Sequence, residues 1–208
     1  MRKLLLFLIT CAVVLTGCGS ADSSQTRPAV TSKQYAAPPA MTIDTTKTYY
    51  ATVTTNLGSF KIQLFANETP VTVNNFVFLA NEGYYTGILF HRIIKTFMIQ
   101  TGDPTGTGSG GPGYRFADEL PPKHNYDVGI VAMANAGKNT NGSQFFVCTG
   151  PDAAGLNAFP NYTEFGMVVS GMDVVQKIAA VPTVLGADGQ MSKPVNPPWI
   201  SKIVISNQ

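Results

Sequence analysis

The sequence has few charged residues and few side chains that bind metals. Charged residues make up 12% of its 208 residues, about half the usual share in globular proteins. Arg2 and Lys3 account for the formal net charge of +2, because 14 basic residues less these two leave 12, against 12 acidic ones. A nucleic-acid-binding protein should carry a basic field, so we exclude that class. With only His91 and His124 as histidines, we expect neither a zinc site nor any other metal or cofactor.

Cysteine is also scarce. Cys11 and Cys18 lie near the N-terminus, and only Cys148 remains in the body of the chain, within the apolar run QFFVCT. A single thiol forms no internal disulfide, even in an oxidising compartment. We expect a buried, inert Cys148, because a reactive thiol needs a positive and exposed setting.

The first 17 residues have the pattern of a leader. Residues 4–15 form an apolar run after a short positive start. The run is too short to span a bilayer but fits the apolar region of a signal peptide. It ends in Leu15-Thr16-Gly17-Cys18, which resembles a bacterial lipobox. An ordinary secretory leader with an accidental cysteine is the alternative.

From this pattern we predict a signal peptide at 1–17 and a lipid on Cys18. Acyl chains buried in a bilayer would anchor the protein durably. We therefore expect it in the cell envelope, tethered to a membrane and facing the periplasm or another extracytoplasmic space. Residues 18–45 are rich in Ser, Thr, Ala and Pro and lack an apolar period. We therefore predict that residues 18–45 are a lipidated cysteine followed by a flexible tether. Residues 46–208 are predicted to form a single domain.

The domain is predicted to be all-β, with two helices. Thr69-Pro70 offers a helix start, apolar residues follow at helical spacing, and Gly83 marks the end; a second helix is expected at 171–180. Eight strands are expected at 49–55, 59–65, 88–93, 97–101, 128–133, 144–149, 163–169 and 199–206. Such short, regularly spaced strands favour a closed eight-stranded antiparallel β-barrel, which leaves no strand edge exposed, capped by the two α-helices.

A long segment at 102–127 is rich in Gly and Pro and has no periodicity. Loops of this length in a compact domain are usually functional or disordered. Residues 106–111 formally match the pattern GxGxxG. Because Pro112-Gly113 follows in place of a helix, a phosphate-binding loop is not predicted.

Two segments carry the chemistry of this chain. They are Phe90–Asp103, FHRIIKTFMIQTGD, and Met133–Phe146, MANAGKNTNGSQFF. Both resemble the two signature segments of the cyclophilin family of peptidyl-prolyl isomerases, and the likeness extends over roughly residues 47–206. The resemblance implies the eight-stranded barrel with two helices, and an enzyme that isomerises the peptide bond before proline. In the cell envelope, its substrates would be proline-containing segments of exported proteins that are folding.

The resemblance also implies a set of site residues. Arg92 matches the active-site arginine. The pocket for the proline ring matches Phe97, Met98, Phe146 and Leu156. The groups that hold the substrate backbone match Gln100, Asn135 and Gln144, with Ala134 beside them. Tyr162 stands where many members have histidine, at the border of the pocket.

The proposed reaction explains why an arginine suffices. The peptide C–N bond resists rotation with a barrier of about 18–20 kcal/mol, because nitrogen shares its lone pair with the carbonyl. In the twisted transition state the nitrogen regains that lone pair. A guanidinium donor aimed at it would stabilise the twisted state more than either planar one. No proton transfer, metal or cofactor is required.

The sequence departs from the family pattern beside the proline pocket. Many members carry a tryptophan just before the position of Leu156, where this chain has Gly155. The family uses that indole as a hydrogen-bond donor to the drug cyclosporin. We therefore expect weak cyclosporin binding with isomerase activity retained.

Simpler interpretations remain open. Arg92 alone would be a surface charge, and Phe97, Met98 and Phe146 alone would be core. Phe145 and Phe146 must face opposite sides of a strand, and by the family match Phe146 is expected to be the exposed one. A module that binds proline segments without turnover is the first rival function. A lipocalin-like carrier is the second, although many phenylalanines favour a filled interior. Nothing indicates oligomerisation, so we expect a monomer.

Overall fold

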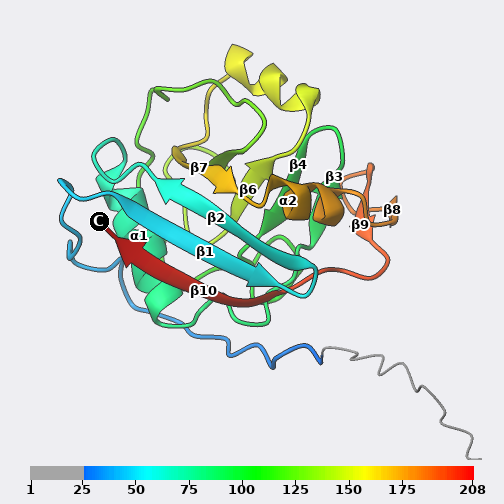
Figure 1. Ribbon diagram of the computed structural model, residues 1–208, viewed down its shortest axis with the longest axis horizontal. Helices are drawn as coiled ribbons and strands as arrows, with labels where there is room; N and C mark the ends of the chain where they lie inside the picture. The colour runs from blue at the N-terminus through cyan, green and yellow to red at the C-terminus, as the bar shows by residue number, and fades with distance from the viewer. Residues whose placement is uncertain (1–25) are drawn as a thin grey trace, which may run out of the picture.

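The structure, a computed structural model, describes residues 26–208 and shows a strongly curled β-sheet with helices at its ends (Figure 1). The predicted signal peptide and Cys18 lie outside the described residues. The strands are β1 Tyr49–Thr55, β2 Gly58–Leu64, β3 Arg92–Ile94, β4 Met98–Thr101, β5 Ile130–Met133, β6 Phe145–Cys148, β7 Glu164–Ser170, β8 Thr183–Leu185, β9 Met191–Pro194 and β10 Ile200–Asn207. The helices are α1 Pro70–Asn81, α2 Met172–Ala179 and the 3-10 helix η1 Pro151–Ala158.

Eight of the strands form one antiparallel sheet in the order β10-β1-β2-β7-β5-β6-β4-β3. The eight predicted strands are these eight. The predicted closure of the sheet into a barrel is not confirmed, because no ladder joins the edge strands β3 and β10. The strand expected at 88–93 begins only at Arg92, and before it Leu89 forms an isolated bridge with Trp199. Gly87 N–H and Phe90 N–H donate to the Ile200 and Pro198 carbonyls at 2.7 and 2.9 Å, which joins the segment before β3 to the start of β10.

Alternation along each strand separates the inside of the sheet from its outside. In β1, every second residue is buried, and Ala51 and Val53 belong to the interior core. Helix α1 contributes Phe76, whose ring contacts Phe145 and Phe165 at centroid distances of 5.5 and 5.2 Å. The interior is therefore packed with aromatic rings, which argues against a hollow carrier barrel.

Helix α1 begins after Thr69, as the sequence predicts, but Thr69 does not cap it. The Thr69 hydroxyl donates to the Phe65 carbonyl. The free amides of Val71 and Thr72 donate instead to the Glu119 carboxylate, at 3.1 and 2.8 Å. A carboxylate suits a helix N-terminus, where unpaired N–H groups carry partial positive charge. The long segment after β4 thus fastens the helix.

Residues 26–45, here called the N-terminal strap, have no regular secondary structure but lie along the domain. Arg27 Nε donates to the Gly87 carbonyl at 2.7 Å, and Tyr35 N–H donates to the Pro112 carbonyl at 2.8 Å. Ile43 is buried, and Tyr35 packs edge-on against Phe78. The sequence predicted a flexible tether at 18–45; the described part of it is fastened by these contacts.

Two further elements were not predicted. Strands β8 and β9 form a separate two-stranded hairpin, which lies beside β3 in Figure 1. The 3-10 helix η1 precedes β7. Within residues 26–208, neither α-helix has the length and apolar character that a bilayer crossing needs.

Candidate functional site

Arg92 is the first residue of β3 and lies on the outer side of the sheet. Its neighbour Ile93 is packed into the interior core, so strand alternation turns Arg92 and Ile94 outward. Arg92 faces Gln100 of β4 across the ladder. One guanidinium nitrogen, Nη1, lies 3.8 Å from Met98 Sδ, and Nε donates to Asp188 at 2.7 Å.

An apolar cluster separate from the interior core lies next to Arg92; we call it the outer cluster. It takes its residues from the outer face of β3 to β6, from η1 and its flanks, and from the loop residues that follow β2 and precede β5. Its buried members are Phe65, Met98, Tyr126, Ile130, Ala132, Phe146, Cys148 and Ala153, and Ile94, Phe97, Ala134, Leu156 and Tyr162 flank them. Six predicted site residues, Phe97, Met98, Ala134, Phe146, Leu156 and Tyr162, are thus brought into one cluster.

The pair Phe145 and Phe146 shows how one strand serves both clusters. Phe145 belongs to the interior core and Phe146 to the outer cluster, as strand alternation predicts. Phe146 is the outward-facing member of the pair, as expected, although at 5% exposed it is largely covered by the rest of the outer cluster. Its ring forms the floor of the cluster, and half-buried Phe97 and Leu156 form the accessible edge.

Tyr162 is held at this edge by Phe146 and Tyr126. Its ring packs edge-on against Phe146 at a centroid distance of 5.5 Å. Buried Tyr126 donates its hydroxyl to the Tyr162 carbonyl at 2.6 Å and accepts from the Tyr162 N–H at 3.2 Å. Burial raises the pKa of Tyr126 to about 12, so its hydroxyl stays protonated and can donate. Tyr126 was not predicted from the sequence.

Cys148 lies in the outer cluster as a free, buried cysteine. Burial raises its pKa to about 12. The thiol therefore stays protonated at neutral pH and is a poor nucleophile, in agreement with the inert role expected from the sequence. Among the described residues, no group of three or more His, Cys, Asp and Glu side chains is placed to hold a metal ion.

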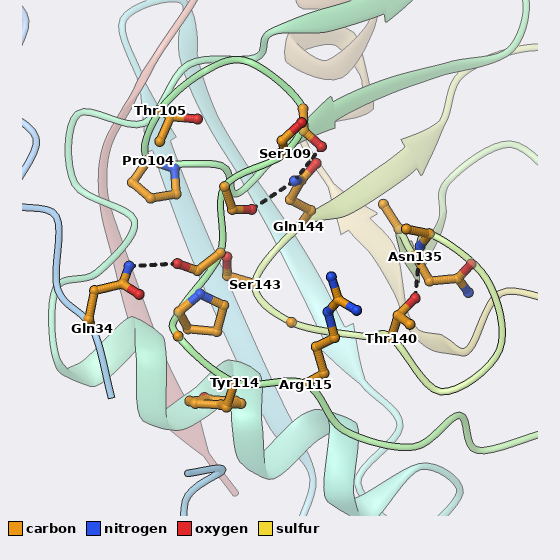
Figure 2. Close-up of a pocket in the computed structure, with 18 of the residues that line it drawn as sticks. Gln34, Pro104, Thr105, Ser109, Tyr114, Arg115, Asn135, Thr140, Ser143 and Gln144 are labelled. Carbon is orange, nitrogen blue, oxygen red and sulfur yellow. Dashed lines mark hydrogen bonds between the residues drawn. The ribbon is translucent and has the colours of Figure 1, made fainter. Parts of the chain in front are cut away.

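A polar hollow of about 870 Å³ lies next to this apolar edge (Figure 2). Three predicted polar residues, Gln100, Asn135 and Gln144, line it together with Ala134. Met98 and Gln100 lie two residues apart on one face of β4. The Arg92 side chain contacts Met98, and Gln100 lines the hollow. Arg92 therefore contacts a member of the apolar cluster and is paired across the ladder with a residue that lines the hollow.

The wall of the hollow is the Gly-rich loop, residues 104–113. Gln144 Nε2 donates to the carbonyls of Gly108 and Gly110 at 3.0 and 2.9 Å, and Gln144 Oε1 accepts from Gln100 Nε2 at 2.9 Å. Figure 2 shows Gln144 turned toward this loop. Gln144 thus supports the wall of the site in this structure. From the sequence, Gln144 was expected to hold the substrate backbone, and this supporting role was not anticipated.

Asp103 organises the Gly-rich loop from within. Its carboxylate accepts the N–H groups of Thr105, Gly108 and Gly110 at 2.7, 2.6 and 3.1 Å. Burial alone would raise the pKa of Asp103, but these hydrogen bonds outweigh burial and hold the pKa below its usual value. Gly102 precedes it at φ +91°, where a side chain would collide with the Ser143 carbonyl. The first part of the segment 102–127 therefore has a defined conformation, held by these hydrogen bonds, and forms the wall of the hollow.

Asn135 holds the opposite side of the hollow. Its Nδ2 donates to the Asn161 carbonyl at 2.9 Å, and its Oδ1 accepts from Gly137 N–H at 3.2 Å. Two further lining residues that the sequence did not reveal are Gln34 and Arg115. Gln34 reaches in from the N-terminal strap and donates to the Gly111 carbonyl at 2.8 Å, and exposed Arg115 points toward the hollow (Figure 2). No motif signals either of them.

We predict that Asp103→Asn loosens the Gly-rich loop. Replacing the charged acceptor should lower the free energy of unfolding by about 1–3 kcal/mol at pH 7 and speed hydrogen exchange at the Gly108 and Gly110 amides. Because the folded pKa of Asp103 is lowered, its stabilisation is present above the unfolded pKa of about 3.9 and is lost as pH falls through the folded pKa. Denaturant unfolding should therefore show a gap between the two proteins that closes in acid.

The control is Asp173→Asn, which changes the same charge at an exposed carboxylate paired with Lys177. It should leave both measurements nearly unchanged. A gap of equal size at pH 7 and pH 2 would contradict the role given to Asp103.

Residues 50–204 match the family model described as "Cyclophilin type peptidyl-prolyl cis-trans isomerase/CLD". Among curated relatives, "Peptidyl-prolyl cis-trans isomerase-like 1" of Neurospora crassa is 49% identical over 136 residues, which cover 63% of this chain and 81% of the relative. "Probable peptidyl-prolyl cis-trans isomerase A" of Mycobacterium bovis is 44% identical over 172 residues, covering 75% of this chain and 91% of the relative.

Solved structures agree with the sequence relatives. A crystal structure of a Cryptosporidium parvum cyclophilin-type peptidyl-prolyl cis-trans isomerase has a TM-score of 0.67 and 36% identity, covering 77% of this chain and 99% of that chain. A second crystal structure of that protein, described as in the presence of the dipeptide Ala-Pro, has a TM-score of 0.66 and 36% identity, covering 76% and 99%.

Proposed function

Because this chain belongs to the cyclophilin-type peptidyl-prolyl cis-trans isomerases, we propose that Arg92 is the residue with which it accelerates rotation about the bond before proline. The enzymatic activity itself follows from the family, its curated relatives and the related solved structures. The observation that supports Arg92 is its position: its guanidinium lies against Met98 of the outer cluster, and across the β3–β4 ladder it is paired with Gln100, which lines the polar hollow.

The reaction needs one well-placed donor. Uncatalysed rotation about a bond before proline takes roughly 10–100 s at 25 °C, because amide resonance must be broken. When the bond is twisted, the proline nitrogen regains its lone pair and becomes a hydrogen-bond acceptor. A donor fixed beside that nitrogen stabilises the twisted state and not the planar ones, which is the condition for a faster rate.

The surroundings of Arg92 strengthen such a donor. Its side chain is 26% exposed, and the thioether of Met98 lies beside it. Electrostatic interactions gain strength where water is partly excluded. The Arg92 Nε–H is already engaged by Asp188, so the remaining N–H groups of the fork are those that meet the substrate.

The substrate would lie across both parts of the site. The proline ring fits the apolar edge formed by Phe97, Leu156 and Tyr162, over the floor made by Met98 and Phe146. The residues before proline would extend into the polar hollow, toward Gln100 and Asn135. The Ala-Pro dipeptide named with a related crystal structure supports a proline-containing peptide as the ligand.

We predict that Arg92→Ala lowers kcat/KM for a proline-containing peptide by about 10²–10³-fold, the usual effect of removing one transition-state donor. Arg92→Lys should recover little, because an ammonium lacks the planar fork. A protease-coupled assay on the full chain in detergent measures both. Lys177→Ala, which removes an exposed cation from α2, serves as the control. Equal rates for Arg92→Ala and the unchanged protein would favour a binding module in place of an enzyme.

Weak cyclosporin binding is a further part of the proposal. The 3-10 helix η1 carries Gly155 where many relatives carry tryptophan, and a Cβ built there meets no atom within 4 Å. The first atom of a side chain at this position therefore meets open space.

We predict that Gly155→Trp lowers the cyclosporin concentration needed for half-inhibition by about 10-fold, the worth of one hydrogen bond and its contact. Inhibition of isomerase activity measures it, and Ala154→Trp, at the exposed neighbouring position, should change it far less. Nanomolar inhibition of the unchanged protein would contradict the proposal.

We also propose that the enzyme is lipid-anchored in the cell envelope and assists folding of exported proteins there. The support is the sequence pattern that ends in Leu15-Thr16-Gly17-Cys18. Cys18→Ser should move the protein from the membrane fraction to the soluble fraction of lysed cells, because the lipid would have no attachment point. Cys11→Ser, within the leader, should not. Membrane retention of the Cys18 variant would contradict the anchor.

A further inference from the structure

The guanidinium of Arg92 is held by a carboxylate that comes from outside the eight-stranded sheet. Asp188 lies in the turn between β8 and β9, 96 residues further along the chain, and its Oδ2 accepts from Arg92 Nε at 2.7 Å. The hairpin lies beside β3, the strand that carries Arg92 (Figure 1). Its turn thus brings a carboxylate to the one cation that the proposed chemistry requires.

The carboxylate of Asp188 is itself fixed within the hairpin. Its Oδ1 accepts from the Ser192 hydroxyl at 2.7 Å and from Gln190 N–H at 3.1 Å, and Ser192 is only 3% exposed. A Cβ at Gly186 would lie 2.3 Å from Ser192 Oγ and 2.8 Å from Asp188 Oδ1, so a side chain there would displace both groups. One oxygen of Asp188 therefore belongs to the hairpin and the other to Arg92.

A bond to Nε orients the whole guanidinium. The group is planar and its five N–H donors have fixed directions, so holding Nε on one side defines where the two terminal nitrogens point. Here Nη1 is directed to the Met98 side, over the outer cluster. Without Asp188, the long arginine side chain could rotate among several rotamers and hold this direction only part of the time.

We propose that Asp188 is a positioning residue, which holds the Arg92 guanidinium in the orientation that meets the twisted proline nitrogen. This inference rests on the proposed catalytic role of Arg92. Asp188 acts through the arginine and does not touch the substrate. Its contribution is preorganisation: the donor is already aimed before the transition state forms.

An effect on activity is distinguishable from an effect on stability. The side chains of Arg92 and Asp188 are 26% and 27% exposed, and ion pairs of this kind contribute little to the stability of the fold. We therefore expect substitutions of Asp188 to change catalysis while the midpoint of denaturant unfolding stays nearly constant. A purely structural role would give the opposite result.

The experiment measures kcat and KM of the full chain with a proline-containing peptide. Asp188→Ala should lower kcat by about 10-fold, because misplacement of a catalytic group costs rate steeply, and should leave KM nearly unchanged, since the interaction is made in the transition state. Ser192→Ala, which removes one bond to Asp188 Oδ1, should give a smaller loss in kcat. Asp173→Ala, at an exposed carboxylate of α2, is the matched control and should have no effect.

A double-mutant cycle tests whether Asp188 acts through Arg92. In the Arg92→Ala background, Asp188→Ala should cause no further loss; an additive loss would overturn the inference. Asp188→Asn, which keeps the shape of the side chain, should lower kcat as well and replaces Asp188→Ala if that variant fails to fold.

The outcomes separate this inference from the proposed function. Full activity or increased activity of the Asp188 variants, with a large loss in Arg92→Ala, would overturn the positioning role and leave Arg92 as the catalytic residue. No loss in Arg92→Ala would instead overturn the proposed function on which the inference rests.

Discussion

The two-residue alternation of strands β4 and β6 is the constraint on which this molecule depends. Each strand sends one set of side chains into an aromatic interior and the other set outward, where a second apolar cluster would hold substrate. Ile99 and Phe145 belong to the interior, whereas Met98 and Phe146 belong to the outer cluster. A slip of one residue in either strand would exchange the two sets. The interior thus fixes the register, and the register places the site.

The polar wall beside the site is held mainly by hydrogen bonds to backbone N–H and carbonyl groups. The wall of the hollow is a loop whose N–H groups converge on one buried carboxylate, Asp103, and whose carbonyls hold Gln144. A loop built in this manner keeps its shape without apolar side chains of its own. It leaves the hollow polar beside an apolar edge, which suits a peptide that has a proline ring and an extended backbone.

The sequence predicted the parts of the site that lie in its two motifs. Arg92, Met98, Gln100 and Phe146 lie on paired strands, where motif and register agree. Asp103 ends the first motif, but its role in the Gly-rich loop is not part of the motif, and Gln34, Arg115, Tyr126 and Asp188 lie outside both motifs. Asp188 lies in the sequence ADGQ, an ordinary turn whose partner lies far away along the chain. The predicted closure of the sheet was not confirmed, because closure depends on the short edge strand β3 and on what its flanking residues contact, and the strand pattern does not contain this information.

The N-terminal strap illustrates the limits of composition. Ser, Pro and Ala are typical of linkers, and the few residues that fasten it, such as Tyr35 and Ile43, stand out only when their partners are visible. Tyr35 N–H and Gln34 bind Pro112 and Gly111, in the wall of the hollow. A fragment that starts at residue 46 would therefore keep every motif of an isomerase and yet lack Gln34, which lines the hollow, and the strap contacts that support its wall. Peptide preferences measured on such a shortened protein would belong to the fragment and not to the full enzyme.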